Sequence, residues 1–121
     1  MAINISEIKG KTLTGIDGGK DSHELVFTTS DGEVYKMFHE QDCCESVRLE
    51  DIVGELQDLI GSPLLVAYAE TSRENPKGGY YEDSFTWTFY RLATIKGSVT
   101  LRWYGCSNGY YSERVDLVRV K

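Results

Sequence analysis

The sequence predicts a small α+β domain: a mostly antiparallel, twisted β-sheet built as a meander of hairpins, with one amphipathic helix packed on its apolar face. Three observations lead to this fold class. Several segments alternate apolar and polar residues, an Asp-Gly turn separates two of them, and one run of apolar residues has helical spacing. The 121 residues suit a single domain over residues 1–121, with enough chain to bury a core.

The clearest hairpin signal lies between residues 24 and 39. Glu24–Thr29 and Glu33–His39 are rich in β-branched and aromatic residues, and they flank Ser30-Asp31-Gly32. An Asp-Gly pair readily adopts the positive φ that tight hairpin turns need, so the two segments are predicted to pair. A shorter β-like segment, Lys11–Ile16, comes before them and closes at Asp17-Gly18-Gly19.

The predicted helix follows a polar loop at residues 40–46. Its apolar residues recur mostly at steps of three and four before Gly61-Ser62-Pro63: Val47, Leu49, Ile52, Val53, Leu56, Leu59 and Ile60. Gly54 weakens the middle of such a helix by about 1 kcal/mol relative to alanine. The start of the helix is open, because Val47-Arg48-Leu49 is equally compatible with a short strand.

The second half of the chain is predicted to be β-structure around a mobile loop at Thr71–Asp83. Leu64–Ala69 reads as a strand before the loop, and alternating segments follow it. Keeping the apolar residues on one face requires Ile95 to pair with Val99, Leu101 with Leu117, and Trp103 with Val115. This register predicts three-residue loops at residues 96–98 and 108–110, or a glycine bulge near Gly109.

The same register gathers polar and aromatic residues on the opposite face: Tyr90, Arg102, Tyr104, Ser112, Arg114 and Asp116. Tyrosine rings could stack on a planar ligand while the arginines bind its phosphate or carboxylate groups. An exposed sheet face of ordinary cross-strand pairs, with Arg102 bridged to Asp116, would have the same pattern. Both interpretations remain open.

Two further residues are candidate ligand contacts. Tyr110 lies in the turn Ser107–Ser112, whose hydroxyls and backbone N–H groups could recognise a nucleotide or a partner backbone. Simple turn chemistry at Asn108-Gly109 is the alternative. His39 begins the polar loop and could border a pocket. With Tyr90, Arg102, Tyr104, Ser112 and Arg114, these two complete the predicted ligand-binding set.

The sequence favours a binding protein without catalytic residues, metal ligands or a cofactor. Cys43 and Cys44 are adjacent and cannot converge on zinc as a Cys-x-x-Cys pair does, and no second ligand pair follows. Glycine-rich phosphate motifs and hydrolase motifs are absent from the sequence. An odd number of cysteines suits a reducing compartment, so we expect free thiols.

Charge and hydropathy restrict the partners. The net charge of −6 opposes direct binding to DNA, RNA or an anionic membrane. No apolar run approaches the roughly 18 residues of a membrane span, and residues 1–7 lack the features of a secretory signal. We therefore expect a cytoplasmic protein.

Four segments, in this order, resemble a family of small phage and prophage proteins catalogued as a domain of unknown function: His39–Val47, Asp58–Leu64, Thr86–Tyr90 and Arg102–Ser112. The resemblance covers nearly the whole chain. It implies a phage or prophage origin and action in the cytosol of a bacterial host, and it brings no catalytic residues with it.

In that setting, the leading hypothesis is a phage-encoded protein that counters host defence by sequestering a nucleotide-derived immune signal. Stacking tyrosines and phosphate-pairing arginines suit this role. An acidic inhibitor of a host defence protein such as a nuclease, similar to an anti-CRISPR protein, is the alternative that the net charge favours. A Cys/His hydrolase ranks third. Homo-oligomers could form through sheet edges or aromatic patches.

Overall fold

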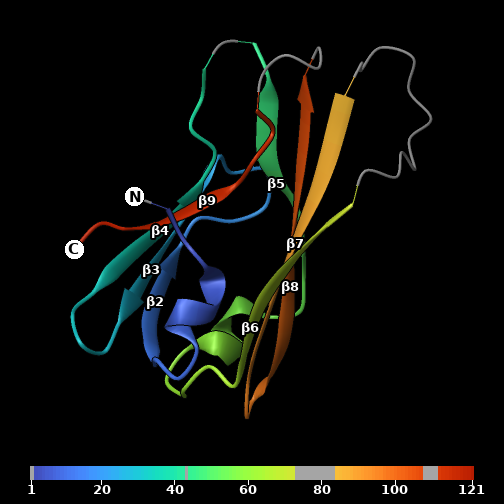
Figure 1. Cartoon of the computed structure of the whole chain (residues 1–121). Helices are drawn as coiled ribbons and strands as arrows, with labels where there is room; N and C mark the ends of the chain where they lie inside the picture. The colour runs from blue at the N-terminus through green and yellow to red at the C-terminus, as the bar shows by residue number, and fades with distance from the viewer. Residues whose placement is uncertain (1, 43, 73–83, 108–111) are drawn as a thin grey trace.

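Two antiparallel sheets make up the protein, and Figure 1 shows how they diverge from one another. The computed structural model describes residues 2–42, 44–72, 84–107 and 112–121. The first sheet has the order β1 (Ala2–Ile3), β9 (Asp116–Arg119), β4 (Val34–Phe38), β3 (Glu24–Thr29), β2 (Leu13–Asp17). The second has the order β5 (Ser46–Val53), β8 (Gly97–Ser107), β7 (Ser84–Thr94), β6 (Val66–Ser72).

The predicted hairpin at residues 24–39 is confirmed. β3 pairs with β4 in an unbroken antiparallel register from Glu24 opposite Phe38 to Thr28 opposite Val34. Gly32 has a φ of +83°, the left-handed conformation that the Asp-Gly signal indicates. Leu25 and Phe27 point into the core and are fully buried, so the alternation along β3 was interpreted correctly.

The predicted amphipathic helix is wrong, and with it the α+β assignment, because the described residues form helix only as two four-residue 3-10 turns, η1 (Ile5–Ile8) and η2 (Leu56–Leu59). Residues 46–53 form β5 instead. A register shift between Leu49 and Asp51 marks a bulge, so the apolar residues Leu49 and Ile52 are three positions apart instead of two. The strand, the bulge and the 3-10 turn together therefore give the apolar residues the steps of three and four that are typical of a helix.

The predicted register between β7 and β8 is also wrong. Leu92, not Ile95, lies opposite Val99, and Ile95 and Lys96 form a two-residue turn. The offset is odd, so every side chain of β7 lies on the face opposite to the predicted one. The inward residues of β7 are Tyr90 and Leu92 together with three threonines: Thr86, Thr88 and Thr94.

The predicted pairing of residues 99–104 with residues 115–117 does not occur. β8 pairs with β5 and β7, whereas β9 pairs with β1 and β4 in the other sheet. The chain passes from one sheet to the other through residues 112–115, here called the crossing segment. Arg102 is therefore opposite Phe89 and Asp51, not Asp116.

The core lies between the two sheets. Leu25, Phe27 and Met37 of the first sheet meet Leu49, Leu101 and Trp103 of the second, and each of these side chains is fully buried. Trp103 donates its indole N–H to the Met37 sulfur at 3.2 Å. The predicted placement of Trp103 in the core is confirmed.

Several predictions fall on residues that the structure does not describe. Most of the predicted mobile loop (residues 73–83), the turn at residues 108–111 with Tyr110, and Cys43 lie outside the described residues. Within the described parts of the chain, no helix is long and apolar enough to cross a membrane.

Candidate functional site

The crossing segment is held in place by side chains of the surrounding strands. The buried Glu113 carboxylate accepts hydrogen bonds from the Thr86 hydroxyl at 2.7 Å and the Ser107 hydroxyl at 2.6 Å. Tyr90 donates its hydroxyl to the Val115 carbonyl at 3.3 Å. An added Cβ at Gly105 would lie 3.0 Å from the Glu113 Cβ, so glycine permits this close approach. The second sheet thus fixes the position of a segment that is not itself a strand.

His39, at the end of β4, holds the crossing segment from the other sheet. Its Nδ1 lies 2.7 Å from the Arg114 carbonyl oxygen, and its Nε2 lies 2.8 Å from Glu45 Oε2. Each ring nitrogen of His39 therefore contacts an oxygen of a different segment, and the two contacts together fix the orientation of the ring. The His39 side chain is only 4% exposed and that of Glu45 is fully buried.

The loop after β4 is ordered around the same Glu45 carboxylate. The Asp42 backbone N–H donates to Oε2 at 2.9 Å, and the Gln41 amide donates to Oε1 at 3.1 Å. The Gln41 amide also donates to the Glu45 carbonyl at 2.7 Å. Buried carboxylates are retained where such donors satisfy them. The loop therefore presents a defined surface toward the crossing segment.

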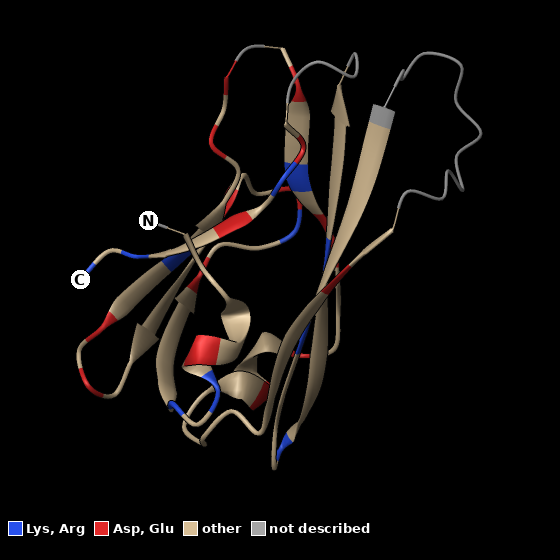
Figure 2. Ribbon diagram, viewed as in Figure 1, with Lys and Arg blue, Asp and Glu red and all other residues tan. Residues whose placement is uncertain are grey.

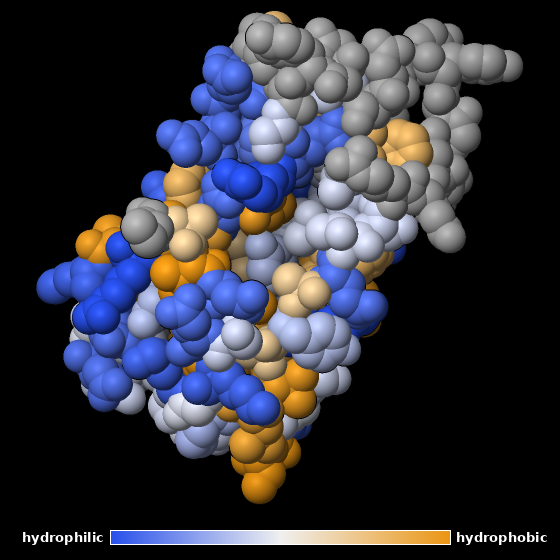
Figure 3. All heavy atoms as spheres, in the orientation of Figure 1, coloured by the Kyte–Doolittle hydropathy of each residue, from blue (hydrophilic) through white to orange (hydrophobic). Residues whose placement is uncertain are grey.

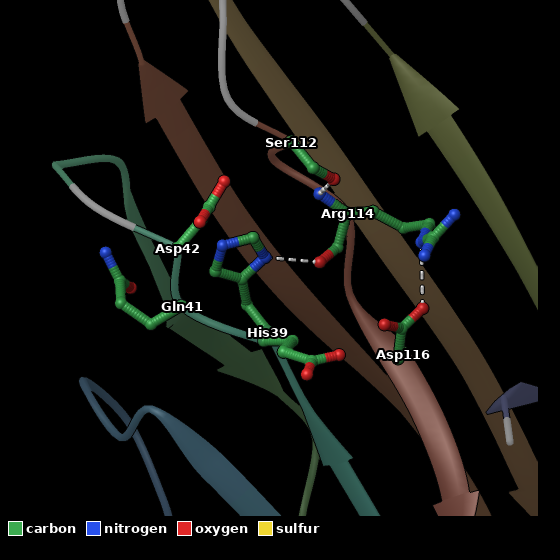
Figure 4. A pocket seen from close by; sticks show the side chains of 7 residues that line it. His39, Gln41, Asp42, Ser112, Arg114 and Asp116 are labelled. Atoms are coloured by element: carbon green, nitrogen blue, oxygen red, sulfur yellow. Dashed lines mark hydrogen bonds and ion pairs between the residues drawn. The ribbon is translucent and has the colours of Figure 1, made fainter.

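Between the loop and the crossing segment lies a pocket of about 280 Å³. Figure 4 shows Gln41 and Asp42 on one side and Arg114 and Asp116 on the other, with His39 between them. The pocket is lined by His39, Glu40, Gln41, Asp42, Ser112, Arg114 and Asp116. We call it the His39–Arg114 pocket.

The charged groups of the pocket are mostly acidic. Glu40, Asp42 and Asp116 contribute carboxylates, and Figure 2 shows acidic residues along the loop that follows β4. Arg114 contributes a guanidinium that is 75% exposed and bound to Asp116 through Nε at 2.9 Å. Its other nitrogens make no hydrogen bond to any described residue. The pocket thus combines one accessible cation with several acceptors.

The structure brings together three residues of the predicted ligand-binding set and separates the others. His39, Ser112 and Arg114 line the pocket. Tyr90 lies in the core at 5% exposure, where burial first and the Asp116 charge second raise its hydroxyl pKa far above the ordinary value. Arg102 and Tyr104 lie on β8, on the face of the second sheet that points away from the core.

That outer face carries a cluster of aromatic and arginine side chains of its own. Trp87 and Tyr104 are register partners with ring centroids 4.5 Å apart. Arg102 lies over the Trp87 ring, 5.3 Å from its centroid, and its Nη2 bonds Glu50 at 3.1 Å. Trp87 and Tyr104 are at most 5% exposed, so neither offers an open stacking surface in this structure.

Sequence reasoning missed the two buried glutamates. Glu45 and Glu113 each stand in a polar run, where acidic residues are expected to face solvent. Nothing in their spacing distinguishes them from Glu40 or Asp42. The prediction of free thiols is also wrong for Cys44, which takes part in a disulfide, whereas Cys106 is present as a thiol. No cluster of three or more metal-ligating side chains occurs in the described ranges.

Comparison with known proteins identifies a family but no activity. A family model described as "Domain of unknown function (DUF7448)" matches residues 6–117. No curated protein and no solved structure matches the chain.

Proposed function

The chain belongs to the DUF7448 family of unknown function, and we propose from the geometry that it is a non-catalytic protein that binds a small nucleotide-derived ligand in the His39–Arg114 pocket. One observation carries the proposal. His39, Ser112 and Arg114, three members of the predicted ligand-binding set, border one cavity. Phage origin and sequestration of a host immune signal, suggested by the motif resemblance, form part of the proposal.

The charges of the pocket indicate which parts of such a ligand each group would contact. The exposed nitrogens of Arg114 can donate to one phosphate group. Glu40 and Asp42 can accept hydrogen bonds from ribose hydroxyls or a base amino group. With three carboxylates beside one guanidinium, a polyphosphate chain would be repelled. We therefore expect a ligand with one or two phosphate charges and several hydrogen-bond donors.

The hydrogen bonds of His39 support binding without catalysis. A general base needs an unshared ring nitrogen within reach of the substrate. Both nitrogens of His39 instead hold protein acceptors, and its side chain is 4% exposed. His39 is therefore a positioning residue for the crossing segment, and Arg114 is the residue expected to contact the ligand.

Calorimetric titration against nucleosides, nucleoside monophosphates, cyclic mono- and oligonucleotides and inorganic phosphate tests the proposal. We expect at least one phosphate-bearing nucleotide to bind and to be recovered chemically unchanged. Arg114→Ala should weaken that binding by about tenfold or more, because a charge-assisted hydrogen bond contributes about 1.5–3 kcal/mol.

Arg119→Ala is the matched control. Arg119 is another exposed arginine close in sequence, at the end of β9, where it bonds Glu33 at 3.2 Å outside the pocket. Its loss should leave binding unchanged. If no compound of the panel binds, or if both variants weaken binding equally, the pocket is not the site; a chemically altered nucleotide would indicate an enzyme.

A second candidate function, inhibition of a host protein, is favoured by exposed apolar side chains toward the closed end of the β7–β8 hairpin. Ile95 in the turn is 84% exposed, and Val53, opposite Thr100, and Leu65, bonded to Ala93, are 59% and 55% exposed. Figure 3 shows apolar side chains at the tip that corresponds to this turn. Exposed apolar patches are frequent protein-binding sites. Loss of an identified host partner in Ile95→Asp, but not in Arg114→Ala, would support this role.

A further inference from the structure

We infer that two copies of this chain pair through the outer edge of β6, which joins their β5–β8–β7–β6 sheets into one continuous antiparallel sheet. The inference concerns a surface separate from the His39–Arg114 pocket and does not depend on the proposed function. It rests on a comparison of the four strand edges that the two sheets present.

Three of the four edges are protected against further pairing. β1 has only two residues. β2 contains a bulge between Leu13 and Gly15, and Leu13 accepts a backbone hydrogen bond from Gly61 at 2.8 Å. Short strands, bulges and covering segments are the usual means by which proteins prevent edge pairing.

β5 is protected in several ways. It has a bulge between Leu49 and Asp51 and carries several charged side chains. Its outer edge is covered as well, because Leu49 exchanges backbone hydrogen bonds with Asp21 at 2.6 Å and Ser22 at 2.9 Å. The covered residue Leu49 and the bulge beside it interrupt the row of unpaired backbone groups along this edge.

η1 lies beside β6, but the strand has none of the other protections. It runs for seven residues in unbroken register with β7, without a proline, a lysine or a bulge. Its single charged residue, Glu70, is paired with Arg91 at 2.8 Å on the neighbouring strand. Along residues 68–71, no described residue forms a backbone hydrogen bond to its outer edge. An edge of this kind is a template for an added strand.

The stretch available for pairing is residues 68–71, all of which are exposed, with Tyr68 at 45%. A second copy is the occupant that these residues favour. Two identical edges related by a two-fold axis are self-complementary. Although the chain has a net charge of −6, the local charge here is close to zero because Arg91 neutralises Glu70.

The pleat fixes the position of the axis. Directly opposed residues of a continuous antiparallel sheet share a face. One residue of β6 must therefore lie directly opposite the same residue of the other copy, with the two-fold axis midway between them. The two central residues of the stretch are Ala69 and Glu70. If the axis lay at Glu70, this carboxylate would face the same carboxylate of the other copy and repel it. The axis therefore lies between the two copies of Ala69, which places each Tyr68 opposite Glu70 of the other copy.

Disulfide trapping tests this arrangement directly. Residues opposed across an antiparallel pair have Cα atoms about 4.5–5.5 Å apart, within disulfide range. Ala69→Cys should form a covalent dimer under mild oxidation. Ile95→Cys is the matched control, because Ile95 is 84% exposed yet lies in the β7–β8 turn, beyond the start of β6 and away from residues 68–71. The unmodified chain, oxidised in the same way, shows how much covalent dimer its own cysteines form.

Sedimentation velocity of the unmodified chain over a wide concentration range provides the second measurement. We expect a reversible dimer, weakened about tenfold by Tyr68→Glu, which places like charges opposite each other twice. Ile95→Glu adds the same charge elsewhere and should leave the dimer unchanged. A chain that stays monomeric at all concentrations, or Ile95→Cys trapping as fast as Ala69→Cys, would overturn the inference.

Discussion

Arg102 and Arg114 illustrate two ways in which a protein positions an arginine. Arg102 lies within a sheet, over the Trp87 ring and bonded to Glu50, with neighbours fixed by strand register. Arg114 lies in the irregular crossing segment, 75% exposed at the edge of a pocket. The first arginine is surrounded by structural partners. The guanidinium of the second is exposed, and its backbone is held by the His39 side chain and not by strand pairing.

The largest expected effect concerns the anchor of the crossing segment. Glu113→Ala would remove the carboxylate that accepts the buried Thr86 hydroxyl and the half-buried Ser107 hydroxyl, and it would open a small cavity. We expect the free energy of unfolding to fall by about 2–4 kcal/mol, measured by urea denaturation. Glu113→Gln, which preserves the shape, should cost less. An unchanged stability of Glu113→Ala would show that the segment is held by other contacts.

The next effect tests the register that gives Arg102 its partners. Gly54 has a φ of +107°, and an added Cβ would lie 2.5 Å from the Ser98 carbonyl oxygen. Gly54→Ala should therefore destabilise the protein by about 1–3 kcal/mol. In the helix that the sequence suggested, the same substitution would stabilise by about 1 kcal/mol. The sign of the change in urea midpoint decides between strand and helix.

A smaller effect concerns the Tyr90 anchor and depends on pH. Burial, followed by the charge of Asp116, raises the Tyr90 pKa above its ordinary value of 10. This contribution to stability is fully present below pH 10 and is lost as the pH rises from there toward the raised pKa. Unfolding measured from neutral to strongly alkaline pH should show a shallower fall in Tyr90→Phe than in the unmodified chain. Parallel curves would contradict the burial of this hydroxyl.

The smallest effects compare the two arginines directly. Arg114→Ala removes an exposed ion pair and should change the free energy of unfolding by less than about 0.5 kcal/mol. Arg102→Ala also loses packing on Trp87 and should cost about 1 kcal/mol. For ligand affinity we expect the opposite order, with a larger loss in Arg114→Ala than in Arg102→Ala. Equal effects on both properties would remove the distinction between the two sites.

Local patterns predicted local structure well. The Asp-Gly signal identified the β3–β4 hairpin, and the alternation placed Leu25, Phe27 and Trp103 in the core. Failure came where the pattern of one strand had to be interpreted without its partner. Along β7, threonines appeared to mark the solvent face, yet Thr86 faces inward because the Glu113 carboxylate accepts its hydroxyl. That acceptor comes from a segment 27 residues away in the sequence.

For the candidate site as well, the sequence indicated individual residues but not how the fold groups them. His39, Ser112 and Arg114 were selected for their chemistry, and they line one pocket. Arg114 and Arg102 would share a face only if strands adjacent in the sequence paired with each other. The crossing segment breaks that assumption by carrying the chain into the other sheet. Residue type indicated candidates, whereas their grouping depended on a topology that no local pattern encodes.

The crossing segment also makes the pocket a property of the folded state alone. Its two sides are positioned by different sheets, through His39 on one and Glu113 on the other, so the unfolded chain has no equivalent surface. By linkage, any compound that occupies the pocket must raise the melting temperature. Saturation at 100 times the dissociation constant corresponds to about 2.7 kcal/mol. Metabolite libraries can therefore be screened for the proposed ligand by measuring the melting temperature alone.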